Sequence, residues 1–130
     1  MTDPISDMLT QIRNSLAVRK PEVVLSFSKL KFNLAGILEK TGWVGEVTTD
    51  GEGTVKKLRL KLKYDDRGLP MISGLLRVSK PGQRIYSKSK AIPRTPLGSG
   101  IGIISTSQGL MTSDEARRAK LGGELICQIW

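Results

Sequence analysis

The segment Gly98–Thr112 reads GSGIGIISTSQGLMT and combines glycines, a short apolar run and three consecutive hydroxyl side chains. Its pattern predicts a strand that runs into a tight reversal at Gln108-Gly109. Because alternate side chains on a strand face opposite ways, we expect Ser105 and Ser107 on one face and Thr106 on the other. Two interpretations are open: the hydroxyls satisfy the backbone of their own turn, or they contact a ligand.

The charge around this segment favours a ligand that is a polyanion. The chain carries 21 Lys and Arg against 12 Asp and Glu, a formal net charge of +9, and such a balance indicates nucleic acid or an anionic membrane. The span 67–112 contains no Asp or Glu, so its cations should lack local ion-pair partners and attract phosphates. These cations are Arg67, Arg77, Lys80, Arg84, Lys88, Lys90 and Arg94.

Composition narrows the class of protein. A chain of 130 residues with 38% hydrophobic and 25% charged residues suits one compact domain or two small subdomains. It has no run of about 20 apolar residues and no signal-peptide pattern, so we expect a cytoplasmic protein. The absence of histidine removes Ser-His and Cys-His nucleophile pairs and ordinary zinc sites. Cys127, in an apolar run, should be a buried core thiol. We therefore expect no catalysis, no metal and no cofactor.

The N-terminal half predicts helix, strand, helix and hairpin. Asp3 as N-cap and Pro4 at the first helical position begin a helix, whose apolar stripe is Ile5, Met8, Leu9, Ile12 and Leu16. Its polar side, with Gln11, Arg13 and Asn14, either touches a phosphate backbone or is an ordinary solvated face. The residues Glu22–Phe27 then form a short β-rich run.

A second helix is predicted to begin at an N-cap, Ser28, and to end at Gly42. Its expected buried stripe is Leu30, Leu34, Ile37 and Leu38. Lys29 and Lys31 lie in the first turn, where cations oppose the helix dipole by roughly 0.3 to 1 kcal/mol each. A phosphate docked at this end, held by backbone N–H groups, Ser28 and both lysines, would explain them. Otherwise both lysines extend into water at slight cost.

Two strands, Trp43–Thr49 and Val55–Tyr64, flank the turn Asp50–Gly53 and predict a hairpin. In the second strand Leu58, Leu60, Leu62 and Tyr64 should face the core, and Lys57, Arg59, Lys61 and Lys63 the other side. We interpret this basic face as an edge protected against aggregation. The turn Asp65–Gly68 is the expected boundary, which gives an α+β protein with an α-β-α-β-β subdomain (1–65) and a mainly antiparallel β subdomain with one short helix (66–130).

The C-terminal half predicts short strands and that helix. Met71–Ser79 and Arg84–Lys88 flank the turn Lys80–Gln83 as a second hairpin. Tyr86 lies between Arg84 and Lys88 and either packs ordinarily or stacks on an unpaired base, worth about 1 to 3 kcal/mol. Thr112 and Glu115 fit a capping box that opens a helix through Lys120, closed by Gly122-Gly123 and followed by a strand, Glu124–Trp130.

Three functional classes were compared. A nucleotide-binding enzyme is disfavoured, because the residues after Gly98, Gly100 and Gly102 are strand-like, whereas a phosphate loop needs a strand before its glycines and a helix after them. A membrane-surface protein would need a basic amphipathic helix with exposed large apolar residues, and neither predicted helix fits, because both apolar stripes are expected to face the core. RNA remains, since hydroxyls suit 2′-hydroxyls, phosphates and base edges, and no helix carries the pattern of a major-groove DNA reader.

Several motifs, in order along nearly the whole chain, resemble the family of protein eight of the bacterial small ribosomal subunit. They are Asp3-Pro4-Ile5, Asp7-Met8-Leu9-Thr10, Ile12-Arg13-Asn14, Ser28-Lys29-Leu30-Lys31, Arg84-Ile85-Tyr86, Gly100-Ile101-Gly102, Ser105-Thr106-Ser107 with Gly109, Met111-Thr112 and Gly122-Gly123-Glu124. The hydroxyl triplet with the following glycine and Met-Thr is the most specific of them. Three positions depart from the family pattern and put peripheral phosphate contacts in doubt: Gln11, Ser26-Phe27 and Lys80.

The resemblance implies a two-part α/β protein that binds the central domain of small-subunit ribosomal RNA directly and early in assembly, without catalysing a reaction. It implies proteins five and twelve of the subunit as neighbours, and repression of its own messenger RNA through a similar RNA fold as an alternative role. Together with the residue patterns it gives these expected RNA-contacting residues: Ser105, Thr106, Ser107, Gln108, Gly109, Tyr86, Arg84, Lys88, Ser28, Lys29, Lys31, Asp3, Pro4, Arg13, Asn14, Gly122 and Gly123.

Overall fold

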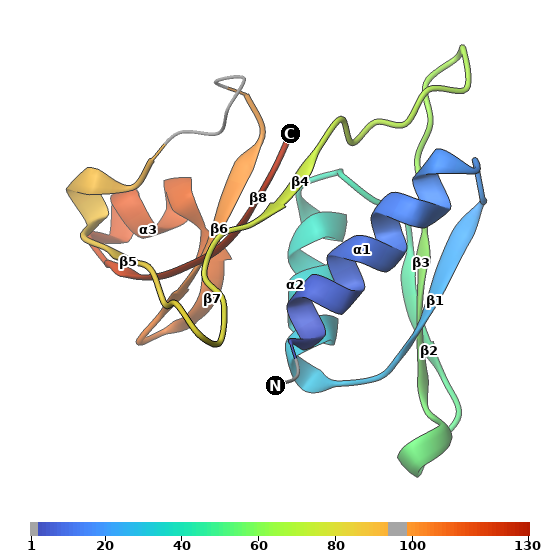
Figure 1. The fold of residues 1–130 in the computed structure, drawn as a ribbon, viewed down its shortest axis with the longest axis horizontal. Coiled ribbons are helices and arrows are strands. Elements are labelled where there is room, and N and C mark those ends of the chain that lie inside the picture. Colours follow the sequence, from blue (N-terminus) through green and yellow to red (C-terminus); the bar gives the residue numbers. More distant parts are fainter. Residues whose placement is uncertain (1–2, 94–98) are drawn as a thin grey trace. The chain divides into compact units, whose positions relative to one another are not determined.

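The computed structural model describes residues 3–93 and 99–130, and it confirms the α+β class (Figure 1). Arg94 and Gly98 lie outside the described residues. Two compact units share the chain, one formed by Pro4–Ile72 and the other by the described residues of 73–130 together with Asp3. The first unit includes the Asp65–Gly68 turn, and the functional division at that turn stays a prediction.

The N-terminal unit is a three-stranded antiparallel sheet, ordered β1-β3-β2, with both helices on one face (Figure 1). The helices and strands have the predicted order, but the two strands of the hairpin are much shorter than the predicted ranges 43–49 and 55–64, and β2 also includes Asp50. They are α1 (Pro4–Ala17), β1 (Glu22–Ser26), α2 (Lys29–Lys40), β2 (Val47–Asp50), a 3-10 turn (Gly53–Val55) and β3 (Lys57–Lys61).

The core of this unit confirms the stripe predicted for α1 and corrects the one predicted for α2. All five predicted apolar residues of α1 are buried. Leu58, Leu60 and Leu62, which were predicted to face the core from the second hairpin strand, are buried as well. In α2 Leu30 is exposed, and Lys31 takes its place in the stripe with Leu34, Ala35 and Leu38. Residues separated by three, one and three positions lie on one face of an α-helix. Lys31 fits there because its aliphatic stem covers apolar surface while its ammonium donates to Ser26 Oγ at 2.8 Å.

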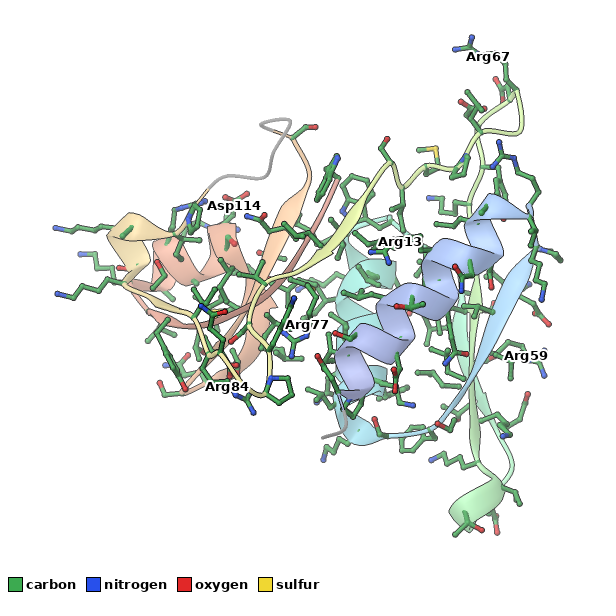
Figure 2. All side chains as sticks on the ribbon, viewed as in Figure 1. Arg13, Arg59, Arg67, Arg77, Arg84 and Asp114 are labelled. Atoms are coloured by element: carbon green, nitrogen blue, oxygen red, sulfur yellow. The ribbon has the colours of Figure 1, made fainter. Side chains whose placement is uncertain are left out.

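The basic face of β3 is not an edge, contrary to our expectation, because β3 is the central strand of its sheet. On that face Arg59 pairs with Glu22 on β1 and, at 3.0 Å, with Asp50 on β2. Figure 2 shows Arg59 at this side of the sheet. The predicted alternation is therefore confirmed, and Arg59 on this face serves cross-strand pairing. Sequence alone did not show that the two acids come from the flanking strands.

The C-terminal unit is an antiparallel sheet built around its last strand. The ladder runs β4-β8-β6-β7, and β5 also pairs with β8. The elements are β4 (Leu75–Arg77), β5 (Tyr86–Ser87), a 3-10 turn (Ser89–Ala91), β6 (Ile101–Thr106), β7 (Gly109–Thr112), α3 (Ser113–Ala119) and β8 (Gly123–Ile129). The helix α3 packs against β6.

The predicted second hairpin is only partly right. The turn Lys80–Gln83 exists, with backbone hydrogen bonds in both directions. The strands on either side of it, however, do not pair with each other. Both pair with β8 instead: Arg77 of β4 lies opposite Cys127, and Tyr86 of β5 lies opposite Glu124. The long strand β8 offers one edge to both of them in succession, and the turn carries the chain along that edge.

The short helix is bounded as predicted at its start and differently at its end. Thr112 and Glu115 form the complete capping box. The helix stops at Lys120, which adopts the left-handed conformation with φ 58°, so the Gly122-Gly123 pair is not its terminator. Cys127 is fully buried, as expected, and burial raises the pKa of its thiol to about 12.

Two cations of the acid-free span 67–112 have acidic partners brought in from elsewhere in the sequence. Arg77 pairs with Asp3 at 3.2 Å, with both side chains largely buried. Arg84 pairs with Glu124 at 2.8 Å. Both acids lie outside the span, so a local count could not find them. Among the described residues of the span in this unit, Lys80, Lys88 and Lys90 have no ion pair.

Candidate nucleic-acid interface

The hydroxyl triplet lies at the tip of the β6–β7 hairpin. Ser105 and Thr106 end β6, whereas Ser107 and Gln108 form the turn itself. Our expectation that Ser105 and Ser107 share a strand face is therefore wrong, because strand alternation stops at Thr106. Gly109 follows the turn with φ 103°, in the left-handed region that favours glycine.

Each hydroxyl of the triplet has a different environment. The Thr106 hydroxyl donates to Gly109 O at 2.9 Å and accepts from Gln108 N at 3.1 Å, so it holds the turn. Ser105 is half-buried beside β8, and Ser107 and Gln108 are exposed. The interpretation that these hydroxyls satisfy their own backbone thus fits Thr106. Ser107 is the one that the hairpin presents to solvent.

The pair Gly122-Gly123 joins this hairpin to the strand that carries Tyr86. Gly123 lies opposite Ser87 on β5, and its neighbour Glu124 lies opposite Ser105 on β6. A Cβ on Gly123 would stand 2.0 Å from Ser105 O, and one on Gly122 would stand 2.6 Å from Ser87 O. Such distances exclude any side chain, so both glycines are required for close packing of three strands. The fold thereby brings three predicted segments to one end of one sheet.

A shallow hollow of about 560 Å³ lies at this junction. Its lining residues are Tyr86, Ser87, Lys88, Ser89, Lys120, Gly122 and Gly123. Tyr86 is 70% exposed, so ordinary packing does not account for its ring. The hollow therefore combines an open aromatic ring, serine hydroxyls and two ammonium groups, which are the groups that bind bases, sugars and phosphates of single-stranded or irregular RNA.

Arg84 is held in position by Glu124 while 49% of its side chain stays exposed, so it stays a predicted phosphate contact. Glu124 accepts from Arg84 Nη1 at 2.8 Å and from Ser79 Oγ at 2.7 Å, and Ser79 Oγ also accepts from Ile85 N. Burial raises the pKa of the Glu124 carboxyl, but the hydrogen bonds from Arg84 and Ser79 outweigh it and lower that pKa below its usual value. The carboxylate therefore stays ionised and holds Arg84 and Ser79, which precede β5 in the chain. Figure 2 shows Arg84 in this region.

The predicted residues of the N-terminal unit form a separate group. Ser28 caps α2 by accepting from Lys31 N at 3.2 Å. Lys29 is exposed, whereas Lys31 is buried with its ammonium donating to Ser26 Oγ at 2.8 Å. Pro4, Arg13 and Asn14 are exposed along α1, and Figure 2 shows Arg13 on that helix. Asp3, half-buried in its pair with Arg77, belongs to the other unit.

Sequence reasoning missed three residues of the hollow: Ser87, Ser89 and Lys120. Lys120 comes from the end of α3, more than thirty residues from Tyr86, and only the sheet pairing unites them. Ser87 and Ser89 could have been predicted from the sequence, because they lie between Tyr86 and Lys90 within the acid-free basic span. Across residues 3–93 and 99–130, no cluster of three or more His, Cys, Asp or Glu could hold a metal ion, and no helix is long and apolar enough to cross a membrane.

Comparison with known proteins identifies the family. The family model described as Ribosomal protein S8 matches residues 3–130. The chain is 50% identical over 129 residues to the small ribosomal subunit protein uS8 of Crocosphaera subtropica, covering 98% of this chain and 97% of that one. It is 49% identical to uS8 of Synechocystis sp. (99% and 98% covered) and 50% identical to uS8 of Caldanaerobacter subterraneus subsp. tengcongensis (100% and 98% covered). With the hydroxyl hairpin, the glycine pair and the tyrosine in place on an α+β scaffold, the chain belongs to the ribosomal protein S8 family.

Proposed function

We propose that this chain is a structural constituent of the small ribosomal subunit, located in the cytoplasm, that binds the central domain of small-subunit ribosomal RNA directly and early in assembly. Three things support the proposal: the family, the net charge of +9, and the junction at Gly122-Gly123. The junction is the observation that carries it, because an exposed aromatic ring, half-buried serine hydroxyls and two lysines without carboxylate partners among the described residues meet there on one sheet.

In this proposal the predicted C-terminal subdomain, residues 66–130, makes the main contacts with the RNA. Ser107 and Gln108 reach 2′-hydroxyls and base edges from the hairpin tip, while Thr106 and Gly109 shape that tip. Tyr86 stacks on an unpaired base, a contact that tolerates any base because every base has a π face. Lys88 and Lys120 neutralise phosphates at the rim of the hollow. Gly122 and Gly123 keep the hairpin, at Ser105, close to β5, so that both can contact the same RNA.

The N-terminal unit supplies further contacts. The exposed Lys29 and the N–H groups at the start of α2, capped by Ser28, suit a phosphate. Lys31, whose ammonium is hydrogen-bonded to Ser26 Oγ, adds positive charge near this phosphate site. Pro4, Arg13 and Asn14 on α1 are additional backbone contacts, and proteins five and twelve of the subunit are the proposed protein neighbours. A segment of the chain's own messenger with a similar fold would compete for the same surface.

Ser107→Ala is expected to weaken binding to a transcript of the organism's own central-domain RNA by about fivefold, because one hydrogen bond to an uncharged group contributes about 0.5 to 1.5 kcal/mol. Lys61→Ala, which removes an exposed lysine from the outer face of β3, is the control and should change affinity by less than about twofold. Filter binding at one fixed salt concentration measures both. Equal losses of affinity for the two variants would show that the overall positive charge of the protein, and not a specific contact of the hairpin, binds the RNA.

A further inference from the structure

An aromatic pair with an adjacent lysine lies at the end of the N-terminal sheet, next to the start of α2 at Ser28 and Lys29. The rings of Phe27 and Phe32 are 5.7 Å apart between centroids, at an angle of 43°. Lys56 Nζ stands 4.1 Å from the centroid of the Phe27 ring. Phe27 N donates to Lys56 O at 3.1 Å, so the strand ends that carry these two residues are held together.

Core packing does not account for Phe32, which is 42% exposed. The buried face of α2 is formed by Lys31, Leu34, Ala35 and Leu38, and Phe32 lies beside that face. Its ring packs against the tilted ring of Phe27, and the residue is otherwise only partly covered. An exposed aromatic ring fixed on one side by a second ring is already ordered, so a ligand that stacks on it loses little conformational freedom.

The charges around the pair are positive and unmatched. Lys29 precedes Phe32 by three residues on α2, so the two side chains share a face of the helix. Neither Lys29 nor Lys56 has an ion pair within the described ranges. Arg59, by contrast, is neutralised by Glu22 and Asp50 two residues further along β3. Lys56, whose ammonium lies over the Phe27 ring, and Lys29, on the Phe32 face of α2, therefore bring two ammonium groups without ion pairs to this aromatic pair.

We propose that Phe32, supported by Phe27 and flanked by Lys29 and Lys56, is a stacking platform for an unpaired nucleotide of RNA. The ring takes the base, and the lysines take the phosphates on either side of it. This inference rests on the proposed RNA-binding function and adds a second base-contacting site, in the N-terminal unit, to the one at Tyr86. An acidic protein segment would match the charges but would not need an open π face.

The test uses the full chain and a transcript of the central domain of the organism's own small-subunit RNA. Phe32→Leu keeps an apolar side chain but removes the π face, and we expect it to weaken binding about fivefold. Phe32→Trp should retain the parent affinity. Leu30→Ala is the matched control, because Leu30 is also 42% exposed but lies two residues away, on another face of α2. It should change affinity by less than about twofold.

Ultraviolet cross-linking gives an independent readout. Cleavage after Lys31 and Lys40 releases residues 32–40, a peptide whose sole aromatic residue is Phe32. We expect this peptide to carry cross-linked nucleotide in the parent chain and to lose it in Phe32→Leu. If the parent binds RNA but Phe32→Leu binds equally well and residues 32–40 do not cross-link, the platform is overturned while the proposed function stands. If the parent does not bind RNA at all, the proposed function itself fails.

Discussion

Gly123→Ala is expected to lower the free energy of unfolding by about 3 kcal/mol, the upper range for forcing an extra methyl group into a packed site. The added Cβ would stand 2.0 Å from Ser105 O, 2.9 Å from Ser105 C and 3.2 Å from Thr106 Cα. All three atoms are backbone, so no side chain can rotate away and β6 and β8 must separate. The φ of Gly123 is not in the positive range, so this contact alone causes the loss.

Urea denaturation followed by far-ultraviolet circular dichroism measures this loss. Gly82→Ala is the matched control, because a Cβ there meets no atom within 4 Å and the φ of Gly82 is also not positive. Its stability should stay within about 1 kcal/mol of the parent. We also expect Gly123→Ala to lose RNA affinity, since the hairpin moves away from Tyr86. A Gly123→Ala protein as stable as the Gly82→Ala protein would refute the close packing at the junction.

Tyr86→Ala is expected to weaken RNA binding about 30-fold without a comparable loss of stability. A base stacked on an aromatic side chain contributes about 1 to 3 kcal/mol, and the middle of that range corresponds to this factor. The stability should hardly change, because the side chain is 70% exposed and the backbone pairing of Tyr86 with Glu124 does not depend on it.

Tyr86→Phe separates stacking from hydrogen bonding, since it keeps the ring and removes the hydroxyl. It should bind within about threefold of the parent if stacking supplies the energy. Isothermal calorimetry at constant salt, with thermal denaturation of each variant, measures both quantities. Parent-like affinity of Tyr86→Ala would exclude the hollow as a base site, and a loss of stability that matches the loss of affinity would assign Tyr86 to the fold instead.

The sequence was sufficient for the elements that local patterns determine. The stripe of α1, the caps at Ser28 and Thr112, and the alternation from Leu58 to Leu62 all depend on residues within a few positions of one another. Such signals are short-range, so they can be read without knowing the tertiary structure.

What the sequence did not reveal depends on pairing between distant segments. β3 is central, β4 and β5 share one edge of β8, and Asp3 and Glu124 neutralise cations of an acid-free span. The site shows the same limit. Its residue types were recognisable, but the role of Gly122-Gly123 was read as a helix stop, because only the strand pairing shows that Ser87 O and Ser105 O press against them.

The central claim is that the junction of the hydroxyl hairpin, the glycine pair and Tyr86 is where this chain binds its ribosomal RNA. Hydroxyl-radical footprinting of the organism's own small-subunit RNA, with the parent chain and with Tyr86→Ala and Ser107→Ala, tests it most directly. We predict protection of one irregular helix in the central domain by the parent, and selective loss of protection at different nucleotides of that helix in each variant. Protection spread over the RNA and unchanged by both variants would contradict the account.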